Sequence, residues 1–143
     1  MNSWYLEYIS RVTPSEILPG VIYFLEGLKA EGIKIAVGSA SKNALTILKQ
    51  IDMEGYFDAV VDGRKVSRVK PDPEVFILAA SELALVPVFC VVFEDAIAGA
   101  INGNMKSVGA GSSDVLGKAD IVIPGCFDCY PFIFIDSCWD RVS

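Results

Sequence analysis

The chain contains no histidine, few cysteines and fewer basic than acidic residues. The absence of histidine excludes Ser-His and Cys-His nucleophile pairs and zinc sites built on imidazole. Twelve Lys and Arg against 18 Asp and Glu give a net charge of −6, so we expect no nucleic-acid or acidic-membrane partner. No apolar run reaches the roughly 18 residues of a membrane-spanning helix. Because the first residues carry no basic segment of a signal peptide, we expect a cytoplasmic protein.

The four cysteines are Cys90, Cys126, Cys129 and Cys138. Cys90 lies in an apolar run and is expected to be a small core residue. The other three could in principle bind zinc, but such a site needs a fourth ligand, and the residues that follow Cys129 are poor candidates.

The chain has 143 residues, of which 52% are hydrophobic. This is enough for one domain with its own hydrophobic core. Short apolar runs alternate with segments of helical periodicity, which predicts a parallel sheet with helices on both faces. We expect strands at 33–38, 59–62, 90–93, 106–109 and 119–123. We expect helices at 1–12, 21–31, 44–51, 74–83 and 96–102, and a helical turn at 113–116.

Smaller signals refine these boundaries. Gly32 suits a left-handed helix C-terminus, Ser41 is a plausible N-cap, and Asp72 and Pro73 suit the cap and first position of the next helix. The aromatic segment 124–143 is atypical and has little periodicity, and we assign no function to it.

Three polar clusters follow predicted strands. Residues 39–43 read Ser39-Ala40-Ser41-Lys42-Asn43 and combine hydroxyls, a lysine and free amides at a helix start, which favours an anion site. Residues 70–73 read Lys-Pro-Asp-Pro, and Glu94-Asp95 is a carboxylate pair of the kind that suits Mg²⁺. Each cluster alone also fits an ordinary role: a capping serine, a loop lysine, an N-cap beside a solvated glutamate.

The carboxyl ends of parallel strands meet at one edge of a sheet, where ligands bind. An anion site, a lysine and a carboxylate pair in one crevice indicate magnesium-dependent phosphoryl transfer.

The order and spacing of these clusters resemble the second, third and fourth signatures of the haloacid dehalogenase-like superfamily of phosphatases and phosphomutases. The residues of these motifs are most similar to those of the sugar-phosphate mutases in the superfamily. The resemblance covers about residues 1–123. It implies a three-layer, Rossmann-like α/β core, with residues 1–12 as the remnant of a helical cap.

The resemblance also implies roles for the site residues. Ser39 and the Ala40 amide would hold the transferring phosphoryl group, and Lys70 would neutralise its charge. Glu94 and Asp95 would bind Mg²⁺. The non-transferring phosphate of a phosphorylated sugar, or of another small phosphate ester, would be held by Ser41, Lys42 and Asn43.

One signature is missing. The superfamily carries an Asp-x-Asp pair, nucleophile and general acid/base, on a first strand that lies between the strands ending near Ser39 and Asp95. No such strand precedes Ser39, so the resemblance implies an incomplete core that cannot perform covalent transfer by itself. We expect the two flanking strands to have unpaired edges, open to self-association or to another chain. The alternatives are a sugar-phosphate mutase, a related phosphatase and a non-catalytic pairing module.

Overall fold

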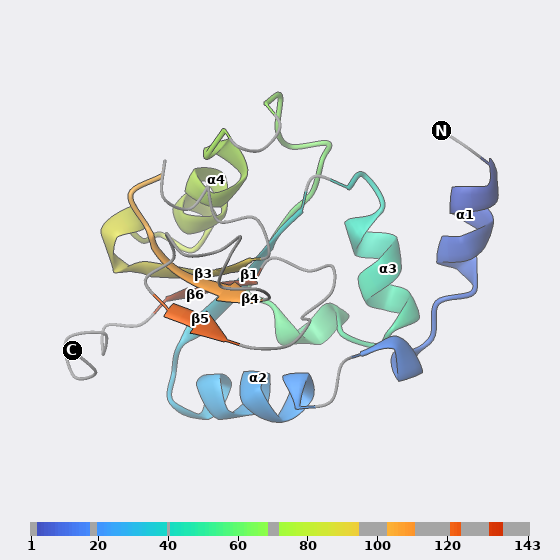
Figure 1. The fold of residues 1–143 in the computed structure, drawn as a ribbon, viewed down its shortest axis with the longest axis horizontal. Helices are drawn as coiled ribbons and strands as arrows, with labels where there is room; N and C mark the ends of the chain where they lie inside the picture. Colours follow the sequence, from blue (N-terminus) through green and yellow to red (C-terminus); the bar gives the residue numbers. More distant parts are fainter. Residues whose placement is uncertain are drawn as a thin grey trace.

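A computed structural model describes residues 3–17, 20–39, 41–68, 72–94, 103–110, 121–123 and 132–135 (Figure 1). The helices are α1 (Ser3–Ser10), α2 (Val21–Ala30), α3 (Ala44–Gln50) and α4 (Glu74–Glu82), with short 3₁₀ turns η1 (Pro14–Glu16), η2 (Glu54–Tyr56) and η3 (Pro87–Phe89). The strands are β1 (Lys34–Gly38), β2 (Ala59–Val61), β3 (Cys90–Glu94), β4 (Lys106–Ala110), β5 (Ile121–Ile123) and β6 (Phe132–Ile135).

The strands form one sheet in the order β2-β1-β6-β3-β4-β5. Neighbouring pairs among β1 to β5 are parallel, which confirms the five predicted strands and the α/β fold. Strand β2, which follows β1 and α3 in the chain, pairs with one edge of β1. Strand β3, which follows α4, lies on the other side of β1 but is not its direct neighbour. The chain therefore skips one strand position in the middle of the sheet.

The C-terminal strand β6 fills that skipped position and runs antiparallel to both neighbours. Phe132 lies level with Val37 of β1 and Phe93 of β3, and Ile135 lies level with Lys34 and Cys90. The prediction of open edges is therefore wrong, because the facing edges of β1 and β3 are paired. The segment 124–143, for which the sequence indicated no element, contains one strand.

Helices cover both faces of the sheet, with α2 on one side and α4 on the other (Figure 1). Alternate residues of β1 face opposite layers, as a strand requires: Ala36 packs in the cluster with Phe76 of α4, and Ile35 and Val37 pack in the cluster with Leu25 of α2. This confirms the three-layer arrangement. Helix α1 packs against α3 at the periphery.

The helix ends confirm one prediction and correct two. Gly32 has φ +74, the left-handed conformation expected after α2. Ser41 is not the N-cap of α3, because Asn43 takes that position and Ser41 Oγ accepts the Asn43 amide instead (3.1 Å). Pro73, not Asp72, is the N-cap of α4, although Asp72 Oδ1 accepts the Glu74 amide as a capping side chain would (3.0 Å).

The helix predicted at 96–102 and the turn at 113–116 lie outside the described residues. None of the helices in the described part of the chain has the length and apolar character that crossing a membrane requires.

Candidate functional site

Of the predicted site residues, those that the structure describes lie at the carboxyl ends of β1 and β3. Ser39 directly follows β1, and Glu94 is the last residue of β3, level with Gly109 of β4. Strand β6 separates the two ends, so they are two strand spacings apart, about 9.6 Å. Ala40, Lys70, Asp95 and the side chain of Glu94 lie outside the described residues.

The loop after β1 brings four predicted phosphate-binding residues together: Ser39, Ser41, Lys42 and Asn43. The Ser39 hydroxyl accepts the Ser41 amide (3.1 Å), and the Ser41 hydroxyl accepts the Asn43 amide (3.1 Å). Such side-chain turns curl the backbone just before the helix. Lys42 is exposed and forms no ion pair with a described residue. The loop therefore presents hydroxyls and a lysine at the carboxyl edge of the sheet.

The loop after β2 is tied to this serine loop. The Ser39 amide donates to the Val61 carbonyl (2.8 Å), and the Gly63 amide donates to the Ser41 carbonyl (3.0 Å). Two adjacent strand ends therefore hold each other in register.

Sequence reasoning missed Asp62 and Arg64 in this second loop. Asp62 is only 2% exposed, and its Oδ1 accepts the Arg64 amide (2.9 Å). Its Oδ2 accepts Nη2 (3.0 Å) and Nε (3.2 Å) of the Arg64 guanidinium. The available signal was the position of Asp62, because it directly follows a strand as the other site residues do.

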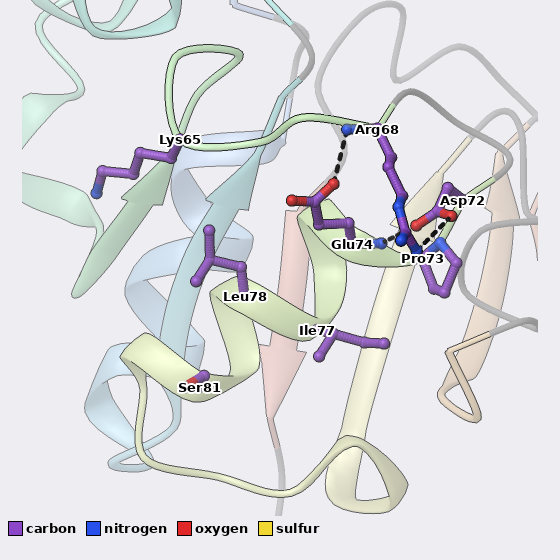
Figure 2. A pocket seen from close by; sticks show the side chains of 8 residues that line it. All are labelled: Lys65, Arg68, Asp72, Pro73, Glu74, Ile77, Leu78 and Ser81. Atoms are coloured by element: carbon purple, nitrogen blue, oxygen red, sulfur yellow. Dashed lines mark hydrogen bonds and ion pairs between the residues drawn. The ribbon is translucent and has the colours of Figure 1, made fainter.

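A groove of about 610 Å³ lies along α4 (Figure 2). Its charged lining residues pair within the chain: Arg68 with Asp72 (3.6 Å) and Lys65 with Glu82 of α4 (3.0 Å). Asp72 and Pro73 of the predicted 70–73 cluster line it, whereas Ser39, Ser41, Lys42 and Asn43, the site residues whose side chains the structure describes, do not.

Glu74 supports the loop above this groove. Its carboxylate accepts the amides of Ser67 (3.1 Å) and Arg68 (2.7 Å), and Figure 2 shows it reaching toward Arg68. The Ser67 amide is the main cause that lowers the pKa of Glu74, and the Arg68 amide adds to it. The carboxylate is therefore held ionised, and it orders the backbone just before Lys70.

Cys90 is a core residue, as predicted. It is fully buried, and its thiol donates to the Val86 carbonyl (3.3 Å). Burial raises the pKa of the thiol to about 11, so it stays protonated and unreactive at neutral pH. The other three cysteines lie outside the described residues. Among the described residues, no three His, Cys, Asp or Glu side chains gather to hold a metal ion.

Residues 5–103, more than half of the chain, match the haloacid dehalogenase-like hydrolase family. The chain belongs to this family, and the resemblance that its three polar clusters suggested is confirmed.

Within the family, the chain is similar to sugar-phosphate enzymes. It is 40% identical over 125 residues to β-phosphoglucomutase of Bacillus subtilis, covering 85% of this chain and 55% of that protein. It is 42% identical over 90 residues to a phosphorylated carbohydrates phosphatase of Thermotoga maritima, covering 59% of this chain and 42% of that protein. The crystal structure of β-phosphoglucomutase from Clostridium difficile matches with a TM-score of 0.82 at 38% identity, over 85% of this chain and 56% of that one.

The chain thus spans about half the length of these relatives. The family match ends at residue 103, so β6 belongs to a part of the chain beyond it.

Proposed function

We propose that this chain forms the phosphate-binding part of a β-phosphoglucomutase-like site for phosphorylated sugars, and that it does not turn them over alone. A complete site of this kind would interconvert β-glucose 1-phosphate and β-glucose 6-phosphate. Support comes from the order of the three polar clusters and from relatives that act on sugar phosphates.

In this proposal the serine loop binds both phosphates. Ser39 and the Ala40 amide hold the group to be transferred, and Lys70 neutralises its charge. Ser41, Lys42 and Asn43 hold the other phosphate. The hydrogen bonds of the Ser39 and Ser41 hydroxyls support this assignment, because they fix the loop before any ligand arrives.

Glu94 and Asp95 are the proposed Mg²⁺ ligands. Adjacent carboxylates at a strand end offer the hard oxygen donors that Mg²⁺ prefers, and β3 ends at Glu94 on the same sheet edge as the serine loop. When bound, the ion would stabilise negative charge on a transferring phosphoryl group. The chain's own contribution is to orient the phosphate beside that position.

The single observation that carries the lack of turnover is the identity of the central strand. Between β1 and β3, where the two halves of the site meet, the chain places the apolar strand β6, with Phe132 at the site edge. Covalent phosphoryl transfer of this type needs a carboxylate nucleophile within reach of the phosphate, and β6 offers none.

The test combines binding and turnover. We expect the purified chain to bind glucose 6-phosphate in the presence of Mg²⁺, measured by calorimetry, and Lys70→Ala to weaken binding about tenfold or more. Lys65→Ala, which removes a lysine already paired with Glu82, is the matched control. No turnover of glucose 1-phosphate or p-nitrophenyl phosphate is expected. Robust turnover that Lys70→Ala abolishes would contradict this proposal.

A phosphatase is the second candidate, because several relatives are phosphatases. Residues 41–43 favour the mutase, since a simple phosphatase needs no grip on a second phosphate. If the purified chain turns over at all, comparing release of inorganic phosphate with isomerisation of glucose 1-phosphate separates the two.

The third candidate is a module that pairs with another chain through its sheet edges. Because β6 closes the middle of the sheet, the terminal strands of the sheet order are β2 and β5, and self-association would use those. Light scattering tests this, and a clean monomer at high concentration would count against it.

A further inference from the structure

The basic loop after β2 carries three described cations, and the structure separates them into two kinds. Lys65 donates to the Val60 carbonyl (2.9 Å) and pairs with Glu82 on α4. Arg68 pairs with Asp72 beside the groove of Figure 2. The partner carboxylates, Glu82 and Asp72, are partly exposed, each with 31% of its side chain accessible. Arg64 differs, because its partner is the buried carboxylate of Asp62.

Asp62 fixes the guanidinium of Arg64 in one orientation. The carboxylate directly follows β2, its side chain is 4% exposed, and it also accepts the Arg64 backbone amide. A guanidinium has five N–H donors, and Asp62 accepts two of them. The others have no partner among the described residues, and the Arg64 side chain is 60% exposed.

The backbone places this oriented cation next to the serine loop. The Gly63 amide, one residue before Arg64, donates to the Ser41 carbonyl, and Ser41 precedes Lys42. Arg64 and Lys42 therefore come from two loops that are bonded to each other at one edge of the sheet. A fixed guanidinium beside a lysine suits a phosphate, which accepts the parallel N–H groups of arginine.

We propose that Arg64 is a specificity-determining residue that, with Lys42, binds the phosphate that is not transferred, and that Asp62 is its positioning residue. The inference rests on the proposed function, since it assigns a further residue to the same site. It predicts that the chain prefers a sugar with two phosphates over inorganic phosphate, and that Arg64 supplies much of this preference.

The test measures the affinities of the full chain for glucose 1,6-bisphosphate and for inorganic phosphate by calorimetry with Mg²⁺ present. Arg64→Ala is expected to lower the bisphosphate affinity about tenfold or more and to reduce the ratio of the two affinities. Arg64→Lys keeps the positive charge but lacks the parallel N–H donors of the guanidinium. It should therefore lose less bisphosphate affinity than Arg64→Ala but should not reach the wild-type value. Lys65→Ala and Arg68→Ala, the matched controls, should stay within about twofold of the wild type.

Loss of Arg64 leaves Asp62 as an uncompensated buried charge, which can destabilise the fold. The double variant Asp62→Asn with Arg64→Ala removes both charges, so it separates folding from binding. It should unfold near the wild-type urea midpoint and still show the reduced ratio.

The outcomes discriminate between the two proposals. If the wild type does not bind glucose 1,6-bisphosphate, the proposed function and this inference both fail. If the wild type binds glucose 1,6-bisphosphate, and Arg64→Ala and the double variant keep the wild-type ratio of the two affinities, only the role of Arg64 is overturned. An equal loss in Lys65→Ala would also overturn it, because the effect would then be one of general charge.

Discussion

Single carboxylates that accept backbone amides hold several loops and the ends of helices and strands. A carboxylate can accept several N–H groups, and each such bond is stronger than one between neutral groups. Four residues of the described chain act in this way: Asp58 on Ile35 of β1, Asp62 on Arg64, Asp72 on Glu74 at the start of α4, and Glu74 on Ser67 and Arg68. The backbone at Ser67 and Arg68 therefore depends on the Glu74 carboxylate.

The lowered pKa of Glu74 predicts how the hydrogen bonds to Ser67 and Arg68 respond to pH. The pKa of Glu74 is lowered from its ordinary value of 4.5, chiefly by the Ser67 amide. A group whose pKa is lower in the folded state stabilises that state above its unfolded pKa, and the stabilisation is lost as the pH falls through the folded pKa. We expect the amide proton shifts of Ser67 and Arg68, measured by NMR, to titrate with a midpoint below 4.5.

Glu74→Gln should abolish this titration, whereas Glu82→Gln, on the same helix but bonded to Lys65, should leave it in place. A midpoint at or above 4.5 in the wild type would contradict the assignment.

At the scale of elements, α4 is seated against the end of β1 that leads to the site. The ring of Phe76 is fully buried, and its Cδ1 atom lies 3.4 Å from the point where a Cβ atom on Gly38 would be. Gly38 is the last residue of β1, directly before Ser39. The packing of α4 thus supports the backbone from which the serine loop starts.

Phe76→Ala should lower the free energy of unfolding by about 3–5 kcal/mol, because it removes a buried ring and leaves a cavity. Ile77, the next residue of α4, is 43% exposed, so Ile77→Ala should cost less than about 1 kcal/mol. Urea unfolding followed by circular dichroism measures both. Similar losses in the two variants would mean that α4 is not packed as described.

The elements could largely be predicted from the sequence because their signals are local. Helix α2 shows its periodicity and the glycine that ends it, and β1 shows its β-branched residues. Strand β6 could not be predicted in the same way. Its four apolar residues lie in an aromatic segment with little periodicity, and its partners β1 and β3 are distant in sequence.

The site was predictable only in part, for a related reason. The rule that ligands bind at the carboxyl ends of strands selected the serine loop and the Glu94-Asp95 pair. The same rule did not show that Asp62 is buried and holds Arg64, because burial and pairing depend on how β1 and β2 lie side by side. The positions of Ala40, Lys70 and Asp95 stay predictions.

At the scale of the whole molecule, β6 joins two parallel groups of strands, β2-β1 and β3-β4-β5, into one sheet. Without it, backbone groups of β1 and β3 would lose their partners, and each unpaired buried group costs about 1–3 kcal/mol. Several such losses approach the total stability of a domain, about 5–15 kcal/mol.

A chain that ends at residue 131 should therefore lose cooperative urea unfolding and should aggregate, as measured by circular dichroism and light scattering. A chain that ends at residue 135 keeps β6 and is the matched control, expected to unfold cooperatively. If the two chains behave alike, β6 does not hold the sheet together.

Among the strands that the structure describes, the one that fills the middle of the sheet, β6, is also the last to be synthesised. Chains begin to fold from the N-terminus during synthesis, at about 5–20 residues per second. For this protein, β1 to β5 are synthesised before β6 can pair with β1 and β3. Until then the facing edges of β1 and β3 have no partner strand. The interval before β6 emerges is therefore when a neighbouring nascent chain can pair with those edges in place of β6.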